Sequence, residues 1–73
     1  MSQIKYAIML WVNDNNKMSV HHLKYVTQPK KPWNEFKRGD NGWSRYPGAA
    51  GEWKYKILAV GGIHMFQVFN NYR

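Results

Sequence analysis

The segment from Ile4 to Val12 restricts the possible folds of this chain more than any other part of the sequence. Apolar side chains alternate along it with a period of two, which is the pattern of a β-strand. One face carries Ile4, Tyr6, Ile8, Leu10 and Val12. The other face begins with Lys5 and is otherwise apolar, with Ala7, Met9 and Trp11. Because a strand that is apolar on both faces belongs in the interior of a sheet or barrel, we predict that this strand is central.

A second strand is predicted directly after the first, which gives a β-hairpin over about residues 3–27. Asn13-Asp14-Asn15-Asn16 forms the turn, because Asn and Asp tolerate left-handed backbone and hydrogen-bond their own main chain. The second strand then runs from Lys17 to about Thr27. Its apolar pattern changes phase at His21-His22, and one extra residue in a β-bulge would return both halves to the same face. We therefore expect a bulge at the two histidines.

The sequence Val60-Gly61-Gly62-Ile63 is the clearest local signal in the C-terminal part of the chain. Two glycines between apolar runs are typical of a two-residue hairpin turn in which both central residues have positive φ. The pattern predicts a second hairpin over about residues 52–71, with Trp53, Tyr55, Ile57, Phe66 and Val68 on its core face. The side chains predicted to be buried include Ile8, Leu10, Trp11, Ile57, Phe66 and Val68.

Two hairpins make an all-β fold with a four-stranded antiparallel sheet. The first strand and the C-terminal strand are the two that are apolar on both faces, so pairing them gives the strand order 2-1-4-3. The edge strands then carry Lys17, Lys24, Lys54 and Lys56, and edge lysines protect against edge-to-edge association. A sheet of this size with one long connection can also curl into a small SH3-like or OB-like barrel.

Residues 28–51 form the predicted loop between the two hairpins. This segment contains all three prolines and four of the six glycines of the chain. Connections longer than about 12–15 residues without their own structure are uncommon in compact domains and tend to be functional or disordered. Pro32 to Arg38 can form one short helical turn, with proline at an early position and Gly39 ending it.

The chain of 73 residues is expected to form a single domain over residues 1–73 with a small core. It has no cysteine, which favours a reducing, cytoplasmic location over a secreted disulfide scaffold. Its 4 Trp, 5 Tyr and 3 Phe can provide stability through aromatic packing, and a homodimer is the other candidate route. The apolar runs are too short for a signal peptide or a membrane span, so we expect a soluble protein with no membrane partner.

Basic and aromatic residues are interleaved through the long loop and into the strand after it. The chain carries 11 Lys and Arg against 4 acidic residues, and its net charge of +7 attracts phosphate backbones or acidic proteins. Proteins that bind single strands combine rings that stack on bases with cations that follow the phosphates. The residues that fit this description are Lys30, Lys31, Trp33, Phe36, Lys37, Arg38, Trp43, Arg45, Tyr46, Lys54 and Lys56. Alternatively, Trp33, Phe36 and Trp43 fold back over one end of the sheet as part of the core.

The three histidines and four acidic residues favour neither a metal site nor an active site. Neighbours in a strand point to opposite faces, so His21 and His22 cannot both bind one ion unless the bulge turns them together. The acidic residues form no pair at a spacing suited to general acid–base catalysis. A small ribonuclease using His21, His22, His64 and Arg45 is the catalytic alternative, but no spacing places an acid beside a base. We therefore expect a non-catalytic protein without a metal or other cofactor.

Two functions fit these observations. The favoured hypothesis is a small basic module that binds single-stranded nucleic acid or RNA through the loop of residues 28–51 and the Lys54/Lys56 end of the next strand. The alternative is a small inhibitor or adaptor, of the kind that phages and other mobile elements encode, that binds an acidic surface of a protein partner. Because Trp, Tyr and Arg also dominate protein interfaces, the residue types alone do not separate the two.

Overall fold

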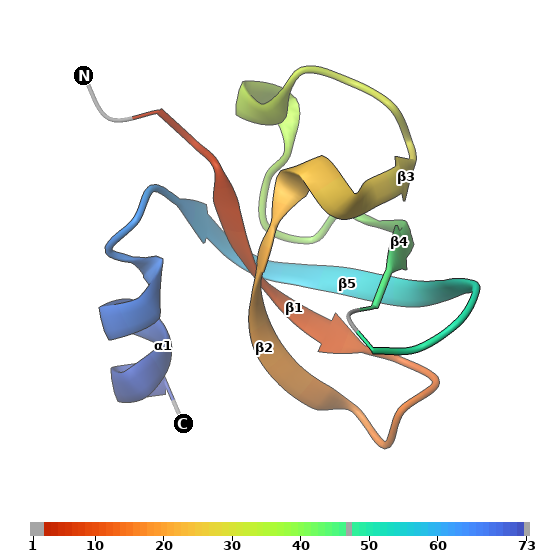
Figure 1. The fold of residues 1–73 in the computed structure, drawn as a ribbon. Coiled ribbons are helices and arrows are strands. Elements are labelled where there is room, and N and C mark those ends of the chain that lie inside the picture. Colours follow the sequence, from red (N-terminus) through yellow and green to blue (C-terminus); the bar gives the residue numbers. More distant parts are fainter. Residues whose placement is uncertain (1–2, 47, 73) are drawn as a thin grey trace.

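The computed structural model describes residues 3–46 and 48–72. Within these residues, five β-strands form one antiparallel sheet in the order β2-β1-β5-β4-β3, and a helix follows the last strand (Figure 1). The described part of the sheet has two edges, β2 and β3, so it is open rather than closed into a barrel. The elements are β1 (Tyr6–Trp11), β2 (Lys17–His22), the 3-10 helix η1 (Leu23–Tyr25), β3 (Val26–Gln28), the 3-10 helix η2 (Trp33–Glu35), β4 (Asn41–Arg45), β5 (Glu52–Gly61) and α1 (Met65–Tyr72).

The predicted first hairpin is present, and its first strand is central as expected. β1 pairs with β2 on one side and with β5 on the other, antiparallel in both cases. The turn is closed by two backbone hydrogen bonds of 3.1 Å, from Asp14 N to Trp11 O and from Lys17 N to Asp14 O. Asn15 and Asn16 both have φ of 56°, the left-handed backbone that asparagine tolerates better than most residues. The asparagine-rich turn is thereby confirmed.

The change of phase at His21-His22 has a different cause from the predicted bulge. β2 keeps a continuous register with β1 as far as His22, and the chain then enters η1. The His22 side chain accepts a hydrogen bond of 3.0 Å from the backbone N of Lys24, which caps this helical turn. The turn brings Leu23 into the core and splits the predicted second strand into β2 and β3. A bulge lies instead between Ile8 and Met9, where β1 pairs with β5.

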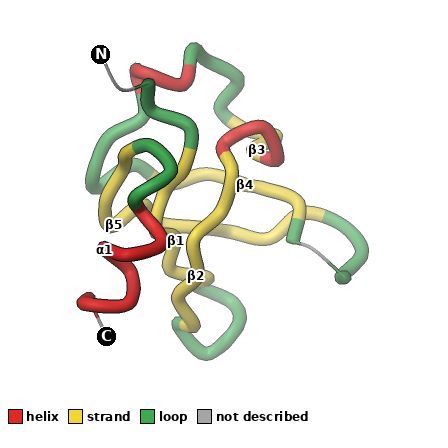
Figure 2. The backbone as a smooth tube through the Cα atoms, turned by 60° about the vertical axis from the view of Figure 1, so that its left-hand side comes forward, coloured by secondary structure: helices red, strands yellow, loops and turns green. Residues whose placement is uncertain are grey.

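The prediction of a second hairpin is wrong, because the chain forms a helix after Gly62. β5 extends to Gly61, and α1 begins at Met65, whose backbone N donates a 3.0 Å hydrogen bond to Gly62 O. Neither glycine has a positive φ. Gly61 instead allows close packing, since a Cβ there would lie 2.5 Å from the Sδ of Met65. Figure 2 shows α1 as a separate red coil beside the strands, joined to the end of β5 by a short loop.

The predicted strand order 2-1-4-3 is therefore also wrong. β5 lies beside β1, and its other neighbour is β4, which belongs to the segment that the sequence assigns to a loop. The positions of β4 that face Tyr55 and the core are small, Gly42 and Ser44, so this strand shows no apolar alternation. Gly42 is required, because a Cβ there would lie 2.1 Å from the carbonyl oxygen of Gln28 and 2.9 Å from the hydroxyl of Tyr55.

The predicted helical turn in the loop is present in a shorter form. η2 covers Trp33–Glu35, with Pro32 as its N-cap and Phe36 as its C-cap. Gly39 does not end this helix, but its φ of 93° serves the next turn, which leads into β4. No helix in the described part of the chain is long and apolar enough to cross a membrane.

The main core lies on one face of the sheet, around the centre of β1. Its buried members come from β1 and β5 and from the connections that fold over them: Ala7, Met9, Trp11, Leu23, Phe36, Tyr55 and Ile57. Ile8 is fully buried too, and alternation places it on the opposite face, where α1 packs on β1 and β2.

Burial follows the sequence prediction in the strands and departs from it in the helix. Ile8, Trp11 and Ile57 are fully buried, as predicted, and Leu10 is half-buried. Phe66 and Val68 are 47% and 41% exposed, so their predicted place in the core is wrong. They lie on α1, where the helical period of 3.6 buries Met65 and turns its neighbours outward.

Candidate nucleic-acid interface

β4 and β5 present basic and aromatic side chains on the face of the sheet opposite the main core. Ser44 of β4 and Tyr55 of β5 are fully buried, and successive side chains of a strand point to opposite faces. The residues on either side of these two therefore point away from the core. We call the resulting surface the basic sheet face, and it consists of Trp43, Arg45, Glu52, Lys54 and Lys56.

The register of the two strands places a tryptophan beside a lysine on this face. Trp43 lies opposite Lys54, and Arg45 lies opposite Glu52. Side chains that face each other across an antiparallel pair have Cβ atoms about 4.5–5.5 Å apart. Trp43 is 39% exposed and both lysines of β5 are exposed, so an accessible ring has a cation beside it. Lys54 and Lys56 thus lie on an interior strand and not on the predicted edge strand.

Apolar side chains continue the basic sheet face toward β1 and β2. Leu10 pairs with Lys56 on one side and with Met18 on the other, and both apolar residues are half-buried. Val12 follows β1 directly, donates its backbone N–H to the carbonyl oxygen of Lys54 at 3.1 Å and is 40% exposed. The lysines of β5 are therefore flanked by Trp43 on one side and by aliphatic side chains on the other.

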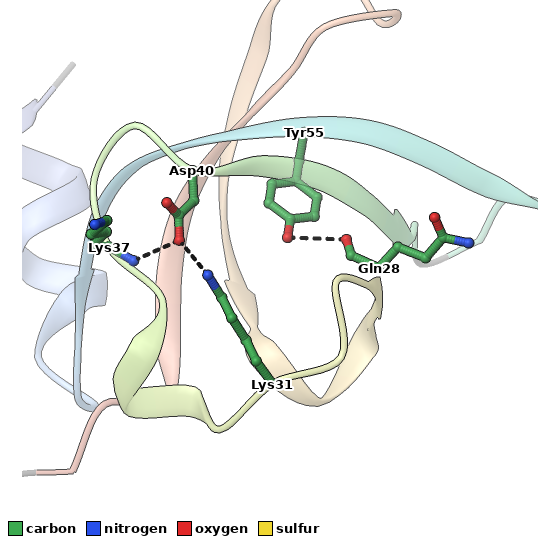
Figure 3. Close-up of polar contacts among 5 residues, drawn as sticks. All are labelled: Gln28, Lys31, Lys37, Asp40 and Tyr55. Carbon is green, nitrogen blue, oxygen red and sulfur yellow. Dashed lines mark hydrogen bonds and ion pairs between the residues drawn. The ribbon is translucent and has the colours of Figure 1, made fainter.

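Lys31 and Phe36, two predicted binding residues of the loop, hold the loop itself together. The Nζ of Lys31 donates to the Asp40 carboxylate at 2.9 Å (Figure 3). The same Nζ lies 4.8 Å from the centre of the Phe36 ring, which is buried. Asp40 also accepts a hydrogen bond of 3.1 Å from the backbone N of Lys37. The hydrogen bond from Lys31 lowers the pKa of Asp40, although burial acts in the opposite direction.

A second contact in Figure 3 fixes the end of β3 against β5. The hydroxyl of Tyr55 donates to the backbone carbonyl of Gln28 at 3.3 Å, while the Gln28 side chain points away from Tyr55. Burial, together with the negative charge of Asp40, raises the pKa of Tyr55 to about 12. The hydroxyl is therefore protonated and remains a donor throughout the physiological pH range.

The other predicted loop residues lie on the surface around η2. Lys30, Lys37 and Arg38 are exposed. Trp33 is 38% exposed, and its ring lies 5.0 Å from that of His22 in an edge-on contact. These four residues belong to the connection between β3 and β4 rather than to the basic sheet face.

Tyr46, the remaining predicted residue, closes one end of the core. Its ring centre lies 4.7 Å from that of Trp11 and 5.4 Å from that of Trp53. The indole N–H of Trp53 donates to the carbonyl oxygen of Ala50 at 3.2 Å, which anchors the connection between β4 and β5. Tyr46 is half-buried.

A pocket of about 800 Å³ lies where β3 meets the connection between β4 and β5. We call it the edge pocket, and its polar and aromatic lining residues are Tyr25, Thr27, Gln28, Arg45, Tyr46 and Glu52. The hydroxyl of Thr27 hydrogen-bonds the Glu52 carboxylate. A second cavity of about 390 Å³ is lined by Gln28, Trp43 and Glu52. It shares Gln28 and Glu52 with the edge pocket and therefore lies beside it.

The histidines occupy separate environments. His21 is buried, its Nε2 lies 2.9 Å from the carbonyl oxygen of Arg45, and burial lowers its pKa. His22 points to the other face of β2, where burial and the charges of Lys24 and Lys5 lower its pKa. Within residues 3–46 and 48–72, no three His, Asp or Glu side chains are grouped so that they could hold a metal ion.

Four of the 11 predicted binding residues come together on the basic sheet face: Trp43, Arg45, Lys54 and Lys56. The other seven lie outside this face. Sequence reasoning missed the edge pocket, because nothing in the pattern pairs Thr27 or Gln28 with Glu52 before the positions of β3 and β4 are known.

No protein-family model, curated protein sequence or solved structure matches this chain.

Proposed function

We propose that this protein binds single-stranded nucleic acid across the basic sheet face. The observation that carries the proposal is the cross-strand pair of Trp43 and Lys54, an exposed ring beside a cation on an open sheet. Single-strand binding needs both groups, because rings stack on the bases while cations follow the phosphates. Lys56 and Arg45 extend the positive charge along both strands, and the net charge of +7 draws polyanions toward the molecule.

An acidic protein surface is the second candidate partner, and the composition of the basic sheet face argues against it. The centres of protein interfaces are depleted in lysine, because a buried ammonium group must lose its water. On this face Lys54 and Lys56 lie at the centre, between Trp43 and the apolar residues of β1. Phosphates bind lysine without burying it, so the arrangement suits a nucleic-acid strand better.

Two tryptophans offer a matched test of the proposal, because Trp43 and Trp33 are 39% and 38% exposed. Binding to a labelled dT oligomer of about 10 nucleotides, within the usual site size of small single-strand binders, is measured by fluorescence anisotropy. Trp43→Ala should weaken binding by about 1–3 kcal/mol, the value of one stacked base. Trp33→Ala, which changes the loop between β3 and β4, should leave the affinity nearly unchanged.

The reverse result would place the binding site on the loop and contradict the basic sheet face. No anisotropy change at low salt with either DNA or RNA oligomers would contradict nucleic-acid binding altogether and leave the acidic protein partner. Thermal unfolding of both variants confirms that they are folded at the assay temperature.

A further inference from the structure

The edge pocket is large enough for a planar ligand, and aromatic side chains line it. Its volume of about 800 Å³ falls within the range of small-molecule sites. Two tyrosines line it, Tyr25, which is 39% exposed, and the half-buried Tyr46, and aromatic rings of this kind stack on bases. Arg45 and Glu52 belong both to the pocket lining and to the basic sheet face, so the pocket opens beside that face. A strand that crosses that face can therefore place one of its bases in the pocket.

Glu52 is unusual for a surface that binds phosphates. It is the acidic member of the basic sheet face, and its charge repels a phosphate backbone. A carboxylate can instead accept hydrogen bonds from the donor edge of a base. The hydroxyl of Thr27 hydrogen-bonds one carboxylate oxygen of Glu52, which fixes the side chain. Because each carboxylate oxygen has two lone pairs, both oxygens can still accept from a ligand.

The chemical groups beside Glu52 complete a recognisable pattern. Gln28 lines both cavities, and its side-chain amide, which points away from Tyr55 (Figure 3), can donate as well as accept. Guanine presents two adjacent donors, N1–H and the N2 amino group, beside the acceptor O6. A carboxylate accepts from both donors, and an amide N–H donates to O6. Adenine, cytosine and uracil each lack this pair of adjacent donors.

Arg45 can bind the phosphate of the same nucleotide. The described residues form two ion pairs, Lys17–Asp14 and Lys31–Asp40, so the guanidinium of Arg45 has no carboxylate partner among them. Guanidinium groups bind phosphate oxygens in a bidentate manner. We propose that the edge pocket takes one base from the bound strand and selects guanine through Glu52 and Gln28. This inference rests on the proposed function, because the strand on the basic sheet face delivers the base.

The test compares a dT oligomer with the same oligomer carrying one central dG, by fluorescence anisotropy at fixed salt. One well-made set of base contacts discriminates by about tenfold or more, so the dG oligomer should bind at least about that much more tightly. Replacing the dG with deoxyinosine, which lacks the N2 amino group, should remove most of the gain.

Two glutamate variants separate base recognition from a general effect of charge. Glu52→Gln and Glu35→Gln each remove one negative charge, but Glu35 is exposed on η2 and does not line the edge pocket. Glu52→Gln keeps a side-chain oxygen for the hydroxyl of Thr27, so we expect the local structure to be retained. Glu52→Gln should abolish the preference for dG, and Glu35→Gln should keep it.

The outcomes distinguish this inference from the proposed function. Binding of both oligomers with equal affinity, or the same dG preference in Glu52→Gln, overturns guanine selection and leaves single-strand binding intact. If neither oligomer binds, the proposed function fails. A titration with 5′-GMP followed by NMR then tests whether the edge pocket binds guanine without a strand. Larger shifts at Thr27 and Glu52 with 5′-GMP than with 5′-AMP support the site, and equal or absent shifts overturn it.

Discussion

Gly42 determines how closely β3 and Tyr55 can approach β4. A Cβ at this position would lie 2.1 Å from the backbone carbonyl oxygen of Gln28, which cannot move without displacing β3. Gly42→Ala should therefore lower the free energy of unfolding by about 1–3 kcal/mol or more, the usual cost of overpacking. Gly61→Ala is the control, because its Cβ would meet the flexible end of Met65. The free energy of unfolding of both variants is measured by urea denaturation. A larger loss in Gly61→Ala than in Gly42→Ala would contradict the packing described for β4.

Asp40 links the stability of the loop to pH. Its folded pKa lies below the unfolded value, so its contribution is complete above the unfolded pKa and is lost as the pH falls through the folded pKa. Asp40→Asn should make the melting temperature fall less than that of the unchanged protein when the pH drops below about 4, because the variant has no carboxylate to protonate at this position. Asp14→Asn should change that profile less, because its contact with Lys17 is 4.0 Å long and the lysine is exposed. Equal effects of the two variants would count against the role of the Lys31–Asp40 pair.

Among the elements, the first hairpin could be predicted from the sequence, and β4 and α1 could not. β1 is apolar on both faces, so its central position follows from alternation alone. β4 has no apolar alternation, because its core-facing positions are the small residues Gly42 and Ser44. Their place in the core depends on contacts with β3 and β5. The segment of α1 has apolar residues at helical spacing as well as one alternating pair, Phe66 and Val68, and so short a run does not decide between helix and strand.

The candidate site was predictable in its residue types but not in its arrangement. Trp43, Arg45, Lys54 and Lys56 are identified by their chemistry, yet only the pairing of β4 with β5 brings them onto one face. Glu52 has no sequence signal as a binding residue, because Thr27 becomes its neighbour only through tertiary structure.

The helical structure of α1 can be tested by comparing one side chain of β1 with one of α1. Ile8 is fully buried, so Ile8→Ala should lower the free energy of unfolding by about 2–5 kcal/mol. Phe66 is 47% exposed and contacts the ring of Tyr6, so Phe66→Ala should cost about 1 kcal/mol or less. Equal large losses in chemical denaturation would instead support the hairpin that the two glycines suggest.

The distribution of positive charge distinguishes the possible binding surfaces at the scale of the whole molecule. Of the 11 Lys and Arg residues, three belong to the basic sheet face, four to the connection around η2, and the other four to the rest of the chain. Long-range attraction uses all of these charges, because the field of a protein sums over its surface. Counterion release on binding instead reports the cations that touch phosphates.

The salt dependence of oligonucleotide affinity therefore tests the central claim most directly. For a single strand, log affinity falls with log salt by about 0.7 per phosphate neutralised. The double variant Lys54→Gln/Lys56→Gln should reduce this slope by about 1.4, for two phosphates. The double variant Lys30→Gln/Lys37→Gln, which makes the same charge change on the loop, should leave the slope nearly unchanged. A slope reduced by the loop pair and unaltered by the pair on β5 would contradict binding across the basic sheet face.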